Sequence, residues 1–388
     1  MKKSMKSALL IATLALFAAT FTACNKTDET TDEADIETKD AIIKQYLNHT
    51  VYPVYTNLAN ETEKLVEKLE LLKANKTQAH VNEAAETFIE ARHWWELSEA
   101  FLFGAASDFG IDPHIDSWPL DEDAFNNLMA SPHMIAQLAN DEDGTVAGEQ
   151  LGNALLGFHG IEYILFQNGE ARLVDGITDD MMTYAVAVSR DLRNRCFQLE
   201  VSWNGDATQA HKDLMEELEF NTSMANGNTY GENMTLAGQA GSTYSTRTQA
   251  LQAIIDGCID IADEVGTSKI GKPHTGDDPT YVESPYSQNS ISDFFDNITS
   301  VKSAYMGGIE AERDNDLSVH HYLRDFNAEM DTKVINAIDK ALEKINNMKA
   351  PFVLNYLDAS AGEAMEACQD LSDVMAEVKA EFAKIDRK

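Results

Sequence analysis

A histidine and a glutamate stand three residues apart in an otherwise apolar segment. If this segment is a helix, His159 and Glu162 project side by side from one face. The apolar residues of the segment fall on the same face, within a sector about 100° wide: Leu151, Leu155, Phe158, Leu165 and Phe166. Helical bundles recruit metal ligands from inward-facing side chains with this spacing. The pattern indicates a metal-binding pair, and the alternative is a buried His–Glu pair that serves only core specificity.

A second segment carries three ionisable residues, Arg92, Glu96 and Glu99, on its apolar stripe rather than opposite it. The stripe is formed by large and small apolar residues at helical spacing: Val81, Ala85, Phe88, Trp95 and Phe103. Burying an ionisable group is costly unless it pairs with another group or binds a cation. Two helices would then both carry charge inward, which a functional polar pocket requires.

The loop between these segments offers a further carboxylate. Pro113 and Pro119 interrupt helix formation, and Asp116 lies between them, close to Trp118. By itself this stretch is typical of an ordinary connection. Together with the two helices it is a candidate third side of the pocket.

The elements that position these residues are predicted to be helices throughout. Apolar residues recur at intervals of three and four, whereas strict alternation over strand lengths is rare. The predicted fold class is therefore all-α. The helical blocks are expected at roughly 40–74, 78–108, 146–168, 178–203, 207–219, 244–266, 288–310, 318–348 and 360–385.

A stretch rich in Asn, Gly, Thr and Ser at 221–243 is the clearest break in the chain. Four long blocks precede it and four follow it, so we predict two halves that each resemble a four-helix bundle, at 41–220 and 244–388. The end of one block, Glu99–Gly104, echoes the end of another, Ser303–Gly308. An internal duplication would explain this echo, and chance similarity of two helix ends is the alternative.

The charge balance excludes one class of function. There are 65 acidic and 30 basic residues, for a net charge of −35. A field this negative repels nucleic acids and anionic membrane surfaces. We therefore expect no nucleic-acid partner and favour small cations.

The N-terminus predicts the compartment. Three lysines precede an apolar run from Ala8 to Ala23 that is too short for a membrane span but suits a secretory signal, so residues 1–23 are predicted to be a signal peptide. The run ends in Ala23-Cys24, which resembles the lipobox of bacterial lipoproteins, and Cys24 is the predicted lipidation site. Residues 24–40 are acidic and poor in large apolar side chains, so we expect a disordered tether. The protein is thus placed in the bacterial cell envelope, lipid-anchored to the outer membrane with a periplasmic or surface face.

The segment Gly157-Phe158-His159-Gly160-Ile161-Glu162 resembles the G-x-H-x-x-E motif of the imelysin family, which is also classed as a peptidase family. Three further blocks support the resemblance and follow in order from residue 95 to residue 287: Trp95–Gly104, Ile115–Asp121, and Gly271-Lys272-Pro273 with Glu283–Ser287. The resemblance covers essentially the whole mature chain. It implies a lipoprotein or periplasmic protein of two helical bundles, with a pocket at their interface and a link to iron uptake.

The resemblance also implies a ligand set. Related iron-uptake proteins are thought to bind metal through the H-x-x-E pair with an additional Glu and Asp. Carried over to this sequence, the predicted metal ligands are His159, Glu162, Glu99 and Asp116, with Glu96 and Asp112 as neighbouring alternatives to the last two. The predicted pocket residues are Arg92, Glu96, Trp118, Lys272 and Ser287.

The predicted cofactor is a divalent or trivalent metal cation, with iron first and zinc as the other candidate. Carboxylates with one imidazole suit such ions, and no cluster of Cys or Met favours copper. The leading hypothesis is a non-catalytic envelope lipoprotein that binds the cation and takes part in iron acquisition beside other iron-uptake proteins. A metallopeptidase is the enzymatic alternative, although the chain lacks the H-E-x-x-H motif of zincins. A module that binds polysaccharide or a protein partner is the third hypothesis.

Overall fold

The computed structural model describes residues 26–385, with side chains placed for residues 33–384, and most of this part of the chain is helical. Its strands form one short antiparallel hairpin, β1 (Phe166–Gln167) and β2 (Glu170–Ala171). The predicted all-α class is confirmed. Among the described helices, none has both the length and the apolarity needed to cross a bilayer. The predicted signal peptide and Cys24 lie outside the described residues.

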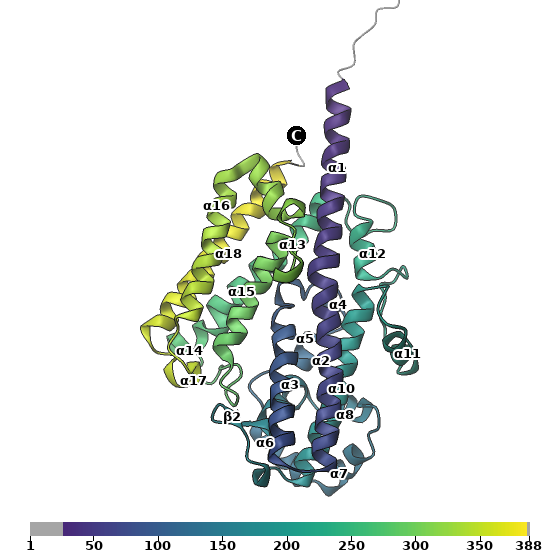
Figure 1. Cartoon of the computed structure of the whole chain (residues 1–388), viewed down its shortest axis with the longest axis vertical. Helices are drawn as coiled ribbons and strands as arrows, with labels where there is room; N and C mark the ends of the chain where they lie inside the picture. The colour runs from purple at the N-terminus through teal and green to yellow at the C-terminus, as the bar shows by residue number, and fades with distance from the viewer. Residues whose placement is uncertain (1–25, 386–388) are drawn as a thin grey trace, which may run out of the picture.

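The first described residues form one long helical rod (Figure 1). Helix α1 (Lys26–Tyr46) continues through a π-helical turn, η1 (Leu47–Val51), into α2 (Tyr52–Ala74). The expectation of a disordered tether up to residue 40 is wrong for the described residues, since α1 already spans them. Apolar burial and polar contacts both hold its second part in place. Ile42, Ile43 and Tyr46 are buried in the core. Lys39 Nζ donates to Thr248 Oγ1 at 2.9 Å, and Arg247 Nε donates to Asp40 Oδ1 at 2.6 Å.

Four helices of the first half contact one another in a ring: α2, α3 (Gln78–Glu96), α9 (Gly157–Leu165) and α10 (Asp179–Trp203). Two predicted blocks are shorter than expected. The block 78–108 ends as a helix at Glu96 and continues as the 3₁₀ turn η2 (Glu99–Phe101) and α4 (Ala105–Asp108). The block 146–168 is divided into α8 (Thr145–Gln150), η3 (Asn153–Leu155) and α9.

The second half is a bundle of four long helices in which each contacts its two neighbours: α13 (Arg247–Glu264), α15 (Ser290–Met306), α16 (Val319–Asn346) and α18 (Ala359–Ile385). The bundle stands beside the first half in Figure 1. The two halves meet where α15 packs against α3 and where α13 and α15 pack against η2.

Short elements connect the long helices. They are α5 (Asp112–Ile115), α6 (Glu122–Met129), α7 (Pro132–Ala139), η4 (Val174–Gly176), α11 (Gln209–Glu217), α12 (Tyr230–Thr235), the π-helical turn η5 (Val265–Lys269), α14 (Gly271–Thr275), η6 (Glu310–Glu312), η7 (Asn315–Leu317) and α17 (Phe352–Asn355). The predicted linker at 221–243 contains α12, whose Tyr230 and Met234 are buried. The assignment of this segment as a domain boundary and the internal duplication remain predictions.

Gly157 fixes the approach of α9 to the loop that carries Asp116. Its φ is +67°, a backbone conformation that residues with a Cβ rarely adopt. A Cβ at this position would lie only 1.8 Å from the carbonyl oxygen of Ile115. The chain therefore breaks the block 146–168 at a glycine, and this break brings His159, two residues later, next to Asp116.

Candidate metal centre

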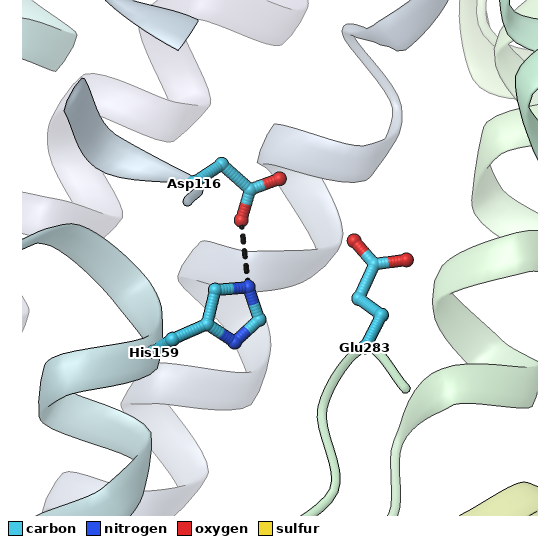
Figure 2. Close-up of side chains that lie close together, drawn as sticks. All are labelled: Asp116, His159 and Glu283. Carbon is cyan, nitrogen blue, oxygen red and sulfur yellow. Dashed lines mark hydrogen bonds and ion pairs between the residues drawn. The ribbon is translucent and has the colours of Figure 1, made fainter. Parts of the chain in front are cut away.

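Three potential metal ligands come together between the two halves: Asp116, His159 and Glu283. Each offers a ligand atom within 4.8 Å of the others, and all three side chains are buried. Figure 2 shows that they come from three separate segments, with His159 on α9, Asp116 in the loop after α5, and Glu283 in the loop before α15. His159 Nε2 lies 3.0 Å from Asp116 Oδ1.

The second ring nitrogen of His159 is held by Glu162. Nδ1 of His159 lies 3.2 Å from Glu162 Oε2. The other carboxylate oxygen, Oε1, accepts hydrogen bonds from Ser287 Oγ at 2.7 Å, from the Ser287 amide at 2.8 Å and from the Tyr286 amide at 3.1 Å. Glu162 thus lies behind the imidazole and directs Nε2 toward Asp116, the arrangement by which an outer carboxylate orients a metal-binding histidine.

Asp116 is fixed by donors on both sides. Trp95 Nε1 donates to Oδ2 at 2.8 Å, while Arg92 and His159 both contact Oδ1. Burial alone would raise the pKa of this carboxyl, but the charge of Arg92 and the hydrogen bond from His159 hold it well below its usual value. Burial lowers the pKa of His159. The hydrogen bonds to Asp116 and Glu162 outweigh this effect of burial, so that the pKa is raised to about 9. The pair is therefore an aspartate and an imidazolium at neutral pH.

Arg92 lies at the centre of the cluster and is fully buried. Its guanidinium contacts Asp116 and Glu96 from the first half, and its Nη2 donates to Glu283 Oε1 at 2.6 Å. The predicted pocket members Arg92 and Glu96 are thus brought together with the predicted ligand Asp116.

A second buried cation, Lys269, was not expected from the sequence. Its Nζ lies 3.2 Å from Glu283 Oε1, 3.3 Å from Glu99 Oε1 and 3.6 Å from Glu96 Oε2. Glu99, predicted as a ligand, is therefore paired with Lys269, and it also belongs to a second group of candidate ligands with Glu96 and Asp116. Lys269 ends the π-helical turn η5, whose extra residue shifts the helical spacing. Helical periodicity therefore could not predict that Lys269 is buried among these carboxylates. The only indication of Glu283 in the sequence was the block Glu283–Ser287 of the family resemblance.

Carboxylates outnumber cations in this buried cluster. Six acidic side chains face three cationic ones: Glu96, Glu99, Asp116, Glu162, Glu283 and Asp293 against Arg92, His159 and Lys269. Burial and repulsion from Glu96 and Asp116 raise the pKa of Glu283 to about 7. Together they outweigh the attraction of Lys269 and Arg92, which lowers this pKa. Burial also raises the pKa of Glu99 and Asp293. Glu283 Oε2 is buried without a hydrogen-bond partner.

A polar pocket of about 220 Å³ reaches this cluster from the surface. We call it the acidic vestibule, and it is lined by Glu99, Asp112, Pro113, Asp116, Ser117, Trp118, Glu264 and Tyr281. Burial, with repulsion from Asp116 and Glu264, raises the pKa of Asp112 to about 7. A larger cavity of about 530 Å³ lies between α1, α16 and α18 and shares no lining residue with the vestibule.

The remaining predicted pocket residues divide into two groups. Trp118 lies beside His159, with 5.8 Å between ring centroids, and Ser287 binds Glu162 as described. Lys272 lies outside the buried cluster, with its Nζ 3.8 Å from the centroid of the Tyr281 ring. The contacts with the buried carboxylates are made by Lys269, three residues earlier. The assignment of Lys272 to the pocket stays a prediction.

Comparison with known proteins identifies relatives along nearly the whole chain. The sequence model of the family described as imelysin, Peptidase_M75, matches residues 51–378. The chain is 27% identical over 290 residues to "Iron-regulated protein A" of Synechococcus elongatus, covering 75% of this chain and 68% of that protein. The crystal structure of a putative iron-regulated protein A precursor from Parabacteroides distasonis has a TM-score of 0.76 and 26% identity, covering 89% of this chain and 95% of that one. An imelysin-like protein from Psychrobacter arcticum shares the fold, with a TM-score of 0.62 at 12% identity over 87% and 93% of the two chains.

The raised pKa values predict how the stability of the metal-free protein depends on pH. Asp112 and Glu283 hold their protons more tightly in the folded protein, with pKa values of about 7, than in the unfolded chain, where about 4 is normal. The stability that these protons supply is complete below about pH 4 and is lost as the pH rises through 7. His159 acts in the same direction between its unfolded value of about 6.5 and its folded value of about 9. The free energy of unfolding should therefore be larger at pH 5.5 than at pH 8.

Urea denaturation at a series of pH values, in the presence of a chelator, measures this difference. Asp112→Asn should reduce the difference by about 1 kcal/mol or more, since one pKa unit corresponds to about 1.4 kcal/mol. Asp277→Asn, at an exposed position, is the matched control and should leave it unchanged. An Asp112→Asn protein with the wild-type pH dependence would contradict the assignment.

Proposed function

This chain belongs to the imelysin family, and from that membership and the buried cluster we propose that it is a cell-envelope lipoprotein that binds a metal cation, with iron as the first candidate. In this proposal the protein takes part in iron acquisition and does not catalyse a reaction. The cation is held between the two halves by Asp116, His159 and Glu283, with Glu96 and Glu99 as neighbouring acceptors.

The observation that carries the proposal is the surplus of buried carboxylates around His159. Charges of one sign in a low-dielectric interior repel one another and are relieved by a cation. Glu283 Oε2 has no hydrogen-bond partner among the described residues, so one donor atom is available without breaking a bond. One imidazole and several carboxylate oxygens suit iron, manganese or zinc. A bound cation would supply the positive charge that the cluster lacks.

The iron assignment is supported by two relatives at 26% and 27% identity whose names call them iron-regulated proteins. Those names describe regulation by iron, and we extend them to an iron-binding role for this protein. Zinc and manganese have the same ligand preferences in this set and serve as comparison ions.

Burial of the site favours binding over hydrolysis. A hydrolytic metal needs an open position for water and a free general base. Arg92, Glu96, Glu162 and Glu283 are fully buried, and His159 is 2% exposed. Glu162 is occupied by His159, Ser287 and Tyr286 and is not free to act as a base. These features of His159 and Glu162 favour cation binding in this proposal.

The location in the envelope is proposed from the signal sequence and Cys24. Lipid on Cys24 would anchor the protein, with other iron-uptake proteins of the envelope as its expected partners. Mass spectrometry of the mature N-terminus tests the anchor. An unmodified Cys24, or a mature chain that begins elsewhere, would contradict it.

The metal proposal predicts a stabilisation that depends on the cluster. Adding Mn²⁺, Zn²⁺ or anaerobic Fe²⁺ to chelator-treated protein should raise its melting temperature, because a ligand that binds only the folded state stabilises it by about 2.7 kcal/mol at 100 times its Kd. His159→Ala and Glu283→Gln should remove most of this rise. Glu162→Gln, which loses only the orientation of the imidazole, should weaken binding by about 10- to 100-fold. Differential scanning fluorimetry and equilibrium dialysis measure both effects.

The matched control is His211→Ala. His211 is also a buried histidine paired with a glutamate, Glu200, at 2.5 Å, but it lies away from the cluster. This variant should retain the wild-type response to metal. If the His159 and Glu283 variants also retain it, or if wild-type protein binds none of these ions, the proposed function is wrong.

A further inference from the structure

Lys269 is a fully buried lysine surrounded by the carboxylates of the candidate site. Its ammonium group lies within 3.6 Å of oxygens of Glu96, Glu99 and Glu283. Burying a charged amine is costly unless it is paired. The three carboxylates compensate this cost, and the strength of the pairing shows in a lysine pKa that is raised above its usual value despite burial.

The ammonium group contacts members of both groups of candidate ligands. Glu283 belongs to the group with Asp116 and His159, and Glu96 and Glu99 belong to the group with Asp116. A lysine ammonium is a compact point charge with three donors, whereas the guanidinium of Arg92 is planar and bridges fixed pairs. Lys269 therefore contacts one oxygen of each of three candidate ligands, including Oε1 of Glu283, and competes with a metal ion for them.

The acidic vestibule offers a second place for this ammonium group. Lys269 Nζ lies 5.4 Å from the centroid of the Trp118 ring, and Trp118 lines the vestibule together with Asp112 and Glu264. An aromatic face and carboxylates both attract an ammonium ion. The lysine stem is long and flexible, and it begins at a π-helical turn, a local irregularity that is frequent at functional sites.

We propose that Lys269 is a built-in counter-cation that fills the site in the metal-free protein and is displaced toward the acidic vestibule when a metal cation binds. This inference rests on the proposed function and adds how the site is regulated. Exchanging a single positive charge for a double or triple one gains attraction from the surplus carboxylates, whereas exchange for Na⁺ or K⁺ gains no charge. Lys269 therefore makes the site selective for multivalent cations and lowers their affinity.

The first test compares two charge-removing variants. Lys269→Met keeps most of the apolar stem of the side chain and removes the competing ammonium group. Its affinity for Mn²⁺ in equilibrium dialysis should therefore be at least about tenfold higher than that of the wild type, which corresponds to about 1.4 kcal/mol. The melting temperature of the metal-free variant should fall, and its rise with Mn²⁺ should be larger. Lys272→Met removes the same charge three residues away, outside the buried cluster, and should change the affinity little.

The second test uses wild-type protein and does not depend on folding of a variant. Labelling with an amine-reactive acetyl ester, read by mass spectrometry, should modify Lys269 slowly in chelator and several-fold faster with saturating Mn²⁺, because the displaced amine enters the vestibule. Lys272 should react at the same rate in both conditions and serves as the internal control.

The outcomes separate this inference from the proposed function. If wild-type protein binds Mn²⁺ but Lys269 labelling does not increase and Lys269→Met binds no tighter, the exchange is wrong and the metal site remains. If only Lys269→Met binds Mn²⁺, the metal does not displace the lysine in the wild-type protein, and both the exchange and the proposed function are wrong. If neither protein binds any multivalent cation, the proposed function fails, and the exchange fails with it.

Discussion

The interaction on which the site depends is the contact of one buried guanidinium with carboxylates from both halves of the protein. Arg92 joins Asp116 and Glu96 of the first half to Glu283 of the second. Removing a single partner from such a cluster leaves an uncompensated charge in a low-dielectric environment, which is strongly destabilising. Arg92 therefore holds the carboxylates of Asp116, Glu96 and Glu283 close to one another.

The fold supplies the pieces of the site from places that only tertiary structure connects. Gly157 allows α9 to begin against the backbone of Ile115, so that His159 meets Asp116. Glu162 then ties α9 to the loop of the second half through Ser287. The imidazole of His159 is thus oriented by a residue that also binds the second half. A cation bound beside His159 and Glu283 would contact both halves of the protein.

The helical periodicity of the sequence was sufficient to predict the fold class and most of the long helices. It also identified the inward-facing charges Arg92, Glu96 and His159, because each lies on an apolar stripe. It could not predict that the block 146–168 is interrupted, since the break depends on a positive φ at Gly157 and a close backbone contact. Lys269 and Glu283 were missed for a related reason. One lies at the end of a π-helical turn and the other in a loop, and neither position has a helical period that would reveal its burial.

Anomalous X-ray diffraction from crystals of metal-free protein soaked in Mn²⁺ tests the central claim most directly. The account predicts one dominant anomalous peak between the two halves, within about 2.0–2.3 Å of His159 Nε2 and of carboxylate oxygens of Asp116 and Glu283, in the range of metal–ligand bonds. The ammonium group of Lys269 should be displaced from Glu283 in the same crystals. An empty cluster with Lys269 still bound to Glu283, while Mn²⁺ occupies only exposed acidic side chains, would contradict the account.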